Sequence, residues 1–289
     1  MAAGTVCPFS PYASLSQASN GQYNLKRAKL SCPNCLSLPV TDPTSLFLLL
    51  VSPAIGSFLG VLVDRLPRGE NVVSRRSFCR SCGEQLNIGD LVPVLSFVWS
   101  KGRCRHCDSS IPPWVLYLEI SAIAVAGFAV IASDTEATML LTAVFLWLLL
   151  GLAVSDLLWM RLPDLLTVLL FVFGLIASMG PGGSGVEMAL LGAALGAGSF
   201  LVLRIIYHAL RGGEGLGLGD VKLMAGLGAF AGPFDLPLLV FGGALLGILW
   251  GAIRHRRGDN LGQQSIPFGT ALCLAAVLLW LGRVTGLLN

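Results

Sequence analysis

The chain has 289 residues, of which 54% are hydrophobic and only 12% are charged, and its formal net charge is +3. Soluble domains carry about 25% charged residues, so this composition excludes an ordinary soluble protein. The small positive charge requires no nucleic-acid partner, because basic cytoplasmic loops account for it in a membrane protein. We therefore expect an all-α polytopic membrane protein.

The N-terminal residues 1–42 differ in composition from the rest of the chain. They lack an apolar core and are rich in Ser, Pro and Asn. A secretory signal peptide needs a continuous apolar region, so we expect a loose tail here instead. The tail holds one Cys-x-x-Cys pair, Cys32 and Cys35, without a second pair beside it. We interpret this pair as incidental.

About eight apolar stretches follow the tail, and each has the character of a membrane helix, which needs roughly 20 apolar residues. Five of them contain no Asp, Glu, Lys or Arg: 43–63, 137–155, 165–186, 236–253 and 260–282. The other three are 109–133, interrupted only by Glu119, then 188–203, and a short glycine-rich stretch at 219–234. The expected domains are a tail (1–42), a first transmembrane helix (43–63), a cytoplasmic domain (64–113) and a transmembrane domain (114–289).

Basic residues predict the orientation of these helices. Many of them lie between the first and second spans: Arg65, Arg68, Arg75, Arg76, Arg80, Lys101, Arg103 and Arg105. Short loops with an excess of Lys and Arg remain in the cytoplasm. The segment 64–113 is therefore predicted to be cytoplasmic, and the following loops alternate between the two sides.

Two Cys-x-x-Cys pairs lie inside the cytoplasmic segment. They are Cys79 with Cys82 and Cys104 with Cys107, separated by residues 83–103. Four thiolates in two such pairs commonly close a tetrahedral structural zinc site. A segment of this size has little hydrophobic core, so a bound metal would supply folding energy.

Three other arrangements of these residues stay open. The cysteines could be reduced and free, or they could form disulfides, which the reducing cytoplasm disfavours. His106 lies between Cys104 and Cys107 and could replace one cysteine ligand. Each alternative changes the ligand set and leaves the position of the segment unchanged.

Three acidic residues lie at the predicted cytoplasmic ends of membrane spans. Asp156 follows one span, and Asp164 and Asp220 begin two others. An ionisable group at membrane depth is costly and is therefore a functional candidate. Two carboxyl groups held close together cannot both ionise readily, so such a pair shares a proton. The ionised member can take a proton from water while the other polarises a carbonyl, which hydrolyses a peptide.

The surroundings of Asp220 are also informative. Asp220 closes the sequence Gly-Leu-Gly-Asp at 217–220, and glycine occupies every second position from 215 to 219. We expect these glycines to permit unusual backbone angles and the close approach of an extended substrate. The chain has neither a Gly-x-Ser-x-Gly nor a His-Glu-x-x-His motif, so it offers little for other hydrolytic mechanisms.

Several motifs occur in one consistent order between residues 45 and 285. They are Ser-Pro-Ala-Ile-Gly-Ser-Phe-Leu-Gly (52–60), Arg-Leu-Pro (65–67), the two cysteine pairs with Asp-Leu-Val-Pro-Val-Leu-Ser (90–96) between them, Gly-Arg-Cys (102–104), Asp156 with Leu-Pro-Asp (162–164), Gly-Leu-Gly-Asp (217–220) and Ile-Pro-Phe-Gly (266–269). In this combination the chain resembles the bacterial type IV prepilin peptidases, which are Gly-x-Gly-Asp membrane aspartic proteases.

The resemblance implies specific roles for these residues. Asp156 and Asp220 match the catalytic pair of the family. Asp164 matches a motif residue that is not catalytic, and we expect it to cap the helix that it begins. The implied reaction is cleavage of the short basic leader of prepilins, or of pseudopilins of type II secretion, at the cytoplasmic face of the bacterial inner membrane.

The resemblance also implies methylation of the new N-terminal amine, with S-adenosylmethionine as the methyl donor, and it ties the segment 64–113 to that activity. The expected partners are prepilin or pseudopilin substrates and the lipid bilayer. The residues themselves indicate no methyl-donor site, because no glycine-rich nucleotide fingerprint follows a strand. The sequence departs from the family at Gly60, where Asn is usual, and at Asp64, where an acid is rare.

Two alternative functions remain at this point. One is a prepilin peptidase that does not methylate its product. The other is a membrane transporter, because intramembrane acids and glycine-broken helices also mark transport paths. We find no inverted repeat between the two halves of the chain, and a transporter has no evident need of two cysteine pairs.

Overall fold

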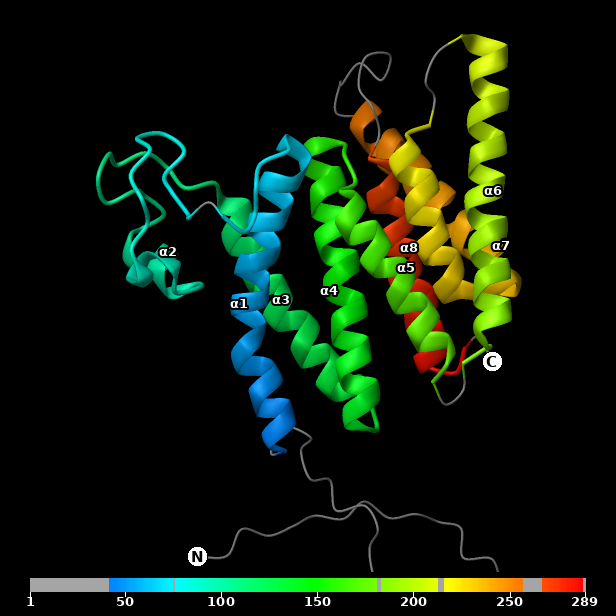
Figure 1. Cartoon of the computed structure of the whole chain (residues 1–289), viewed down its shortest axis with the longest axis horizontal. Helices are drawn as coiled ribbons and strands as arrows, with labels where there is room; N and C mark the ends of the chain where they lie inside the picture. The colour runs from blue at the N-terminus through cyan, green and yellow to red at the C-terminus, as the bar shows by residue number, and fades with distance from the viewer. Residues whose placement is uncertain (1–41, 75, 181–182, 213–215, 257–266, 288–289) are drawn as a thin grey trace, which may run out of the picture. The chain divides into compact units, whose positions relative to one another are not determined.

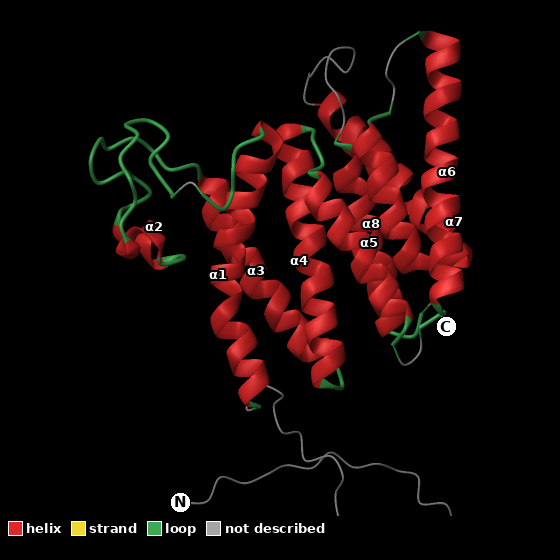
Figure 2. Ribbon diagram, in the orientation of Figure 1, coloured by secondary structure: helices red, strands yellow, loops and turns green. Residues whose placement is uncertain are grey.

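The computed structural model describes residues 42–74, 76–180, 183–212, 216–256 and 267–287, which are mainly helical (Figures 1 and 2). Within these ranges there is no strand, only two isolated β-bridges, Phe78 with Gln85 and Arg103 with Ser110. The predicted tail with Cys32 and Cys35, as well as Arg75, Gly215 and Ile266, lies outside the described residues.

Seven apolar helices form the membrane part of the described chain. They are α1 (Pro43–Arg65), α3 (Pro113–Ala132), α4 (Glu136–Trp159), α5 (Asp164–Ser178), α6 (Val186–Arg211), α7 (Leu218–Arg256) and α8 (Phe268–Val284). By length and composition, α1, α3, α4, α6 and α7 can each cross a membrane, whereas α5 and α8 are shorter apolar helices. The expected all-α polytopic fold is therefore confirmed.

The long helix α7 consists of two helices that meet at Gly232. The φ of 74° and ψ of 175° at this residue are not helical, and glycine accepts such angles without steric cost. The predicted stretches 219–234 and 236–253 are the two parts of α7, so each of the eight apolar stretches contributes a helix. The chain reverses its direction at this break (Figure 1).

A single arginine binds two of the carbonyl groups that this break leaves open. Carbonyl groups freed at a helix end need partners, above all at membrane depth. Arg283, at the end of α8, donates to the carbonyl oxygens of Ala231 at 2.7 Å and Phe230 at 3.3 Å. Its guanidinium also pairs with the Asp235 carboxylate at 2.5 Å. The α8 C-terminus and the break in α7 are thereby joined.

Glycines permit a close contact between α6 and α7. The α6 residue Gly192 packs on the α7 residue Gly228, and a Cβ built on Gly192 would lie 2.3 Å from the Gly228 carbonyl oxygen. Membrane helices associate through small residues that let their backbones approach. The same α7 helix also packs on α5 and α8, and α4 packs on α8 and α5. These contacts bring the ends of α4, α5, α7 and α8 together.

The first two spans form a second helical group beside the first. The helix α1 packs on α3 and α4, and a Cβ on Gly56 of α1 would lie 2.7 Å from the Cα of Glu119 on α3. After α1, the chain makes a short 3₁₀ helix, η2 (Leu66–Arg68), and enters the segment 69–112. That segment contains η3 (Ile88–Leu91), α2 (Leu95–Trp99) and all four cysteines of the two pairs.

The glycine contact between α6 and α7 gives a first prediction. We expect Gly192→Val to destabilise the protein by about 1–3 kcal/mol, because the added carbon atoms overpack a backbone contact. Gly198→Val on the same helix is the matched control, since a Cβ there meets no atom within 4 Å. Thermal unfolding in detergent measures both variants. Equal stability of Gly192→Val and Gly198→Val would contradict the proposed packing.

Candidate active site and metal site

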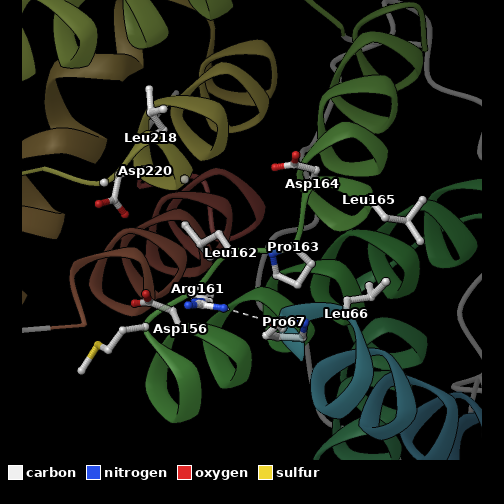
Figure 3. Close-up of a pocket in the computed structure, with 13 residues that line it drawn as sticks. Leu66, Pro67, Asp156, Arg161, Leu162, Pro163, Asp164, Leu165, Leu218 and Asp220 are labelled. Carbon is white, nitrogen blue, oxygen red and sulfur yellow. Dashed lines mark hydrogen bonds between the residues drawn. The ribbon is translucent and has the colours of Figure 1, made fainter. Parts of the chain in front are cut away.

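Asp156 and Asp220 line the same pocket. The pocket has a volume of about 570 Å³ and lies between the start of η2, the α4–α5 connection and the start of α7. Leu66, Pro67 and residues 160–165 form the rest of its wall together with 217–219. Figure 3 shows the two carboxyl groups presented from separate helices, Asp156 from α4 and Asp220 from α7.

The Asp156 carboxylate is held by the first turn of α8. Its Oδ2 accepts the backbone N–H of Thr270 at 2.7 Å, and its side chain is almost fully buried. The Thr270 hydroxyl lies 3.1 Å from the same oxygen and 3.0 Å from the Ala153 carbonyl oxygen, so its one proton can serve either acceptor. The free N–H groups at a helix N-terminus stabilise an anion. Gly269 makes this approach possible, because a Cβ there would lie 3.0 Å from the Asp156 Cγ.

Asp220 is the third residue of α7, and the backbone of Gly217 lies against its carboxyl group. A carboxylate at this position commonly reaches back to the start of its helix, as in a capping box. The expectation of unusual backbone angles is wrong for the described glycines, since neither Gly217 nor Gly219 has a positive φ. The closest neighbour of Gly219 is Leu162, whose Cβ would lie 3.2 Å from an added Cβ. The glycine therefore admits Leu162 into the pocket wall.

Asp164 also lines the pocket but has a different environment. It is the first residue of α5, as predicted, but its side chain makes no capping hydrogen bond. The expectation of a capping hydrogen bond is therefore wrong, because Pro163 is the N-cap residue and the Asp164 carboxylate turns outward. It pairs instead with Lys222 of α7 at 2.7 Å, and the Asp164 side chain is 71% exposed. The carboxylate does lie in the first turn of α5, at the positive end of the helix dipole, as expected.

The α4–α5 connection is fixed by contacts that sequence reasoning missed. Met160 takes a left-handed conformation at the C-cap of α4. The Ser155 hydroxyl donates to the Arg161 carbonyl oxygen at 2.8 Å, and the Arg161 guanidinium donates to the Pro67 carbonyl oxygen at 3.0 Å (Figure 3). Thr270 was missed as well, although it directly follows the Ile-Pro-Phe-Gly motif. The sequence signal that could have indicated Thr270 is a hydroxyl residue in the first turn of a predicted helix.

The four cysteines come together in one cluster. The Sγ atoms of Cys79, Cys82, Cys104 and Cys107 all lie within 4.8 Å of one another. The Sγ atoms of Cys79 and Cys107 are 3.8 Å apart. Four sulfurs bound at about 2.3 Å to one tetrahedral zinc ion stand about 3.8 Å apart, so the donor atoms fit such an ion. Among the described residues, His106 is not part of this cluster, and these cysteines form no disulfide.

The two pairs have the same local architecture. In the first, the N–H of Gly83 donates to the Cys79 carbonyl, and in the second the N–H of Asp108 donates to the Cys104 carbonyl. Gly83 and Asp108 have φ values of 76° and 58°, the left-handed conformation that ends such a tight turn. Backbone N–H groups of Cys82 and Ser81 lower the pKa of the Cys79 thiol to about 6. This favours the thiolate, which is the form that binds metal.

A buried glutamate attaches the cysteine segment to the membrane helices. Glu119 on α3 accepts the backbone N–H of Val94 at 2.7 Å and is 5% exposed. Val94 has φ 61° and ψ −52°, which is an outlier for a β-branched residue. The sequence could have indicated a special role for Glu119, because it is an acidic residue inside a predicted membrane span.

Arginines make a second attachment at the end of α1. Arg65 is 5% exposed, and its guanidinium donates to the carbonyl oxygens of Asn71, Val72 and Arg76. Asp64, one of the two departures from the family pattern, pairs with Arg68 and with Arg80. The other departure, Gly60, faces Trp114, whose ring carbon would lie 3.9 Å from an added Cβ.

Fold and pocket together define a multi-pass membrane protein with two buried or pocket-lining carboxyl groups, Asp156 and Asp220, at one pocket and a cluster of four cysteines that could hold a metal ion. Two family profiles match the chain: the Bacterial Peptidase A24 N-terminal domain at residues 50–133 and the type IV leader peptidase family at residues 143–252. No solved structure matches it.

Relatives carry the name prepilin leader peptidase/N-methyltransferase. The one from Aeromonas salmonicida (strain A449) is 33% identical over 82% of this chain and 90% of its own length. The one from Aeromonas hydrophila is 34% identical with the same coverage, and the one from Bacillus subtilis is 30% identical over 78% of this chain and 90% of its own. The chain therefore belongs to the type IV leader peptidase family and is a protease, which decides against the transporter.

The ion pair of Asp164 gives a second prediction. We expect Asp164→Asn to cost at most about 1 kcal/mol of stability, because exposed ion pairs contribute little. Cleavage activity should fall in part and not vanish, since Asp164 lines the pocket without sharing the buried setting of Asp156. Peptidase assays and thermal unfolding measure the two effects. Complete loss of cleavage in a stable Asp164→Asn protein would move the catalytic role to this residue.

The cysteine cluster gives a third prediction. Protein purified without chelators should carry about one metal ion per chain, and Cys79→Ser or Cys104→Ser should remove it. Elemental analysis by mass spectrometry measures the metal. Cys273→Ala is the matched control, because Cys273 is buried in α8 outside the cluster. Metal-free wild-type protein would exclude the metal site.

Proposed function

We propose that the protein cleaves the leader peptide of type IV prepilins, or of pseudopilins of a type II secretion system, with Asp156 and Asp220 as its catalytic pair. One observation carries this proposal. Carboxyl groups from two separate helices line a single pocket, in a chain of the type IV leader peptidase family. The relatives named prepilin leader peptidase/N-methyltransferase support the substrate class.

The pair can hydrolyse a peptide bond without a covalent intermediate. One carboxylate takes a proton from water, whose oxygen bonds to the peptide carbonyl carbon, while the protonated partner donates to the carbonyl oxygen. The carbon–nitrogen bond then breaks, the leaving nitrogen takes up a proton from the pair, and a hydroxyl group of the tetrahedral intermediate returns a proton to the pair. The Thr270 hydroxyl suits the Asp156 side of this cycle, because it can donate to a carboxylate and accept from a carboxylic acid.

We place the pocket at the cytoplasmic face of the bacterial inner membrane. Arg161 and Lys222 lie at the helix ends that border the pocket, and the preceding segment carries most of the basic residues. Positive residues favour the cytoplasmic side. The connection between α3 and α4 lies at the opposite end of α4 from the pocket. It carries the acidic residue Asp134, and α4 begins with Glu136.

The four-cysteine cluster is proposed to hold a structural zinc ion. The distances between the sulfur atoms support a closed site of four cysteines. Among the described residues, the cluster holds no fifth possible ligand. Structural zinc sites have this arrangement. Zinc there would hold the two tight turns together and thereby fold a segment whose η3 and α2 have no buried residue.

The protein is further proposed to methylate the new N-terminal amine of its product. S-adenosylmethionine would supply an electrophilic methyl group. The amine must first lose a proton to water, and its nitrogen then forms the new bond to the methyl carbon while the bond from that carbon to sulfur breaks, which leaves the sulfur as a neutral thioether. Mass spectrometry of a pilin N-terminus, with and without this protein, tests cleavage and methylation in one measurement.

The proposed pair gives a fourth prediction. Asp156→Asn and Asp220→Asn should each lower cleavage by at least about 100-fold, because an amide cannot exchange the proton that general acid–base catalysis needs. Both variants should still insert into the membrane, since Asn is nearly isosteric with Asp. Cleavage of a prepilin is followed by gel shift in detergent or nanodiscs.

The matched control for this pair is Asp235→Asn. Asp235 lies at the Gly232 break and pairs with Arg283, so it is a membrane-associated aspartate outside the pocket. Its variant should cleave at a rate close to that of the wild type once folded protein is counted. Wild-type cleavage by Asp156→Asn or Asp220→Asn would remove that residue from the mechanism.

A further inference from the structure

The part of the cysteine segment that contains η3 and α2 exposes a run of apolar side chains. Neither helix has a buried residue. Six apolar side chains, here called the apolar patch, are at least 40% exposed: Ile88, Leu91, Val92, Leu95, Val98 and Trp99. Single apolar residues scattered over a surface need no explanation, whereas a cluster of them marks a surface that contacts a protein or a membrane.

Two contacts place the start of α2 at membrane depth. The N–H of Val94, the residue before α2, donates to the carboxylate of Glu119, the seventh residue of α3. A Cβ on Gly56 of α1 would lie 2.7 Å from the Glu119 Cα, so Gly56 and Glu119 lie at one level. Gly56 precedes Asp64 by eight residues, which is about 12 Å along the helix. One glutamate side chain recovers only part of that distance, so α2 begins within the length of the candidate span α1.

The first cysteine turn lies nearer the end of α1. Arg80 in this turn pairs with Asp64, close to the last residue of the helix, and with Glu70 beyond it. The chain therefore runs from the end of α1 back along the helices before it reaches α2. Figure 1 shows the same arrangement, because α2 is level with the C-terminal half of α1 and does not lie beyond its end.

The backbone around α2 satisfies its polar groups without water. The N–H groups of eight residues donate within the segment or to Glu119: Val94, Leu95, Ser96, Val98, Ser100, Lys101, Gly102 and Arg103. The Ser100 hydroxyl donates to the Phe97 carbonyl oxygen at 3.3 Å. An unpaired backbone group is costly in lipid, and this closed backbone avoids that cost.

Residues of the kind that membrane interfaces favour border the apolar patch. Tyr117, two residues before Glu119 on α3, is 65% exposed, and Trp99, the last residue of α2, is 84% exposed. Tyrosine and tryptophan gather at the boundary between the hydrocarbon layer and the headgroups. The exposed Lys101 follows two residues after Trp99, and a lysine at such a depth can extend its ammonium group to the headgroups.

We propose that η3 and α2 form a monotopic membrane anchor, in which the apolar patch inserts among the acyl chains of the surrounding leaflet and Lys101 reaches the lipid phosphates. Lipid is the occupant because the level of Glu119 lies within the spans, where the patch continues the exposed apolar surface of α3 at Tyr117 and Ile120. The inference rests on the proposed function only for the name of the leaflet, which the proposed orientation makes the cytoplasmic one.

The anchor changes the description of the cysteine segment. The segment 64–113 is expected from the sequence to be a cytoplasmic domain, and with this anchor it is partly embedded in the bilayer. The apolar patch would expose its surface to water in a free domain, and in lipid the same surface is removed from water, which is favourable. The segment is then held at two levels, by Arg80 at the end of α1 and by α2 in the leaflet.

The experiment places the photoreactive amino acid benzoylphenylalanine at Trp99 of the full chain, in nanodiscs of phosphatidylethanolamine and phosphatidylglycerol. Ultraviolet light should attach lipid to this position, which mass spectrometry of the intact chain and of its peptides detects. Phe58 is the positive control, because it lies two residues from Gly56 on α1 and is 56% exposed. The adduct yield at Trp99 should be close to that at Phe58. Glu84, exposed beside the first cysteine turn, is the negative control and should give no lipid adduct.

Tryptophan fluorescence tests the same contact with the natural side chain. The emission lost in Trp99→Phe belongs to Trp99, and lipids brominated in their acyl chains should quench it, whereas acrylamide in the water should not. Trp147→Phe is the matched control. Because Trp147 is buried inside the helix bundle, the emission lost in this variant should be protected from both quenchers.

The outcomes separate lipid from other occupants of the patch. A lipid adduct at Trp99 with quenching by brominated lipid supports the anchor. Absence of that adduct when Phe58 gives one overturns it, and so does cross-linking of Trp99 to a second copy of the chain or to added prepilin in place of lipid. Metal content is measured on the same samples. If benzoylphenylalanine at Trp99 removes the metal, the fluorescence decides, and quenching by acrylamide in place of brominated lipid overturns the anchor.

The proposed function stands or fails separately from the anchor. A wild-type chain that forms the anchor but does not cleave prepilin overturns the proposed function alone. A wild-type chain that cleaves prepilin while acrylamide quenches Trp99 overturns the anchor alone.

Discussion

The hydrogen bond from the Thr270 backbone to the Asp156 carboxylate is the interaction on which the arrangement of the pocket depends. A carboxyl group that is almost fully buried at the end of a membrane helix needs donors, and the first turn of α8 supplies them at 2.7 Å and 3.1 Å. This bond fixes α8 against α4. The contact is possible only because Gly269 has no side chain, since a Cβ would lie 3.0 Å from the Asp156 Cγ. With α4 and α8 joined, α7 packs on α8 and α5 and places Asp220 at the same pocket.

The turn that follows α1 is the second constraint, because it joins the aspartate pocket to the cysteine segment. Contacts on two sides hold this turn. On the side of the α4–α5 connection, the Arg161 guanidinium donates to the Pro67 carbonyl oxygen. On the other side, Asp64 pairs with Arg80 of the cysteine segment. Arg68 adds a cation–π contact with Trp159, 4.5 Å from the ring centroid. A shift of the cysteine segment would therefore also displace the wall of the aspartate pocket. This coupling gives a physical reason why one chain carries both parts.

The sequence allowed the helices, the cysteine cluster and the two pocket aspartates to be predicted, because each follows from a local rule. A charge-free run as long as the bilayer is thick must be a helix, and paired Cys-x-x-Cys turns need only short-range geometry. The contacts of Thr270, Lys222 and Glu119 could not be derived in the same way. They join residues that are far apart in the chain, such as Asp164 with Lys222, or Val94 with Glu119. The capping hydrogen bond expected for Asp164 does not form, because Pro163 is the N-cap residue, and the carboxylate pairs with Lys222 of α7 instead.

The order of the two proposed reactions follows from their chemistry. The methyl acceptor, a free amine, exists only after the peptide bond is cut. A product that stays bound near the aspartate pocket keeps its new amine at a higher effective concentration than a released product has. The turn after α1 lies between the pocket and the cysteine segment, and arginines that bind backbone carbonyls anchor it: Arg65 on the side of the cysteine segment and Arg161 on the side of the α4–α5 connection. The segment that the resemblance ties to methylation is therefore attached directly to the wall of the aspartate pocket.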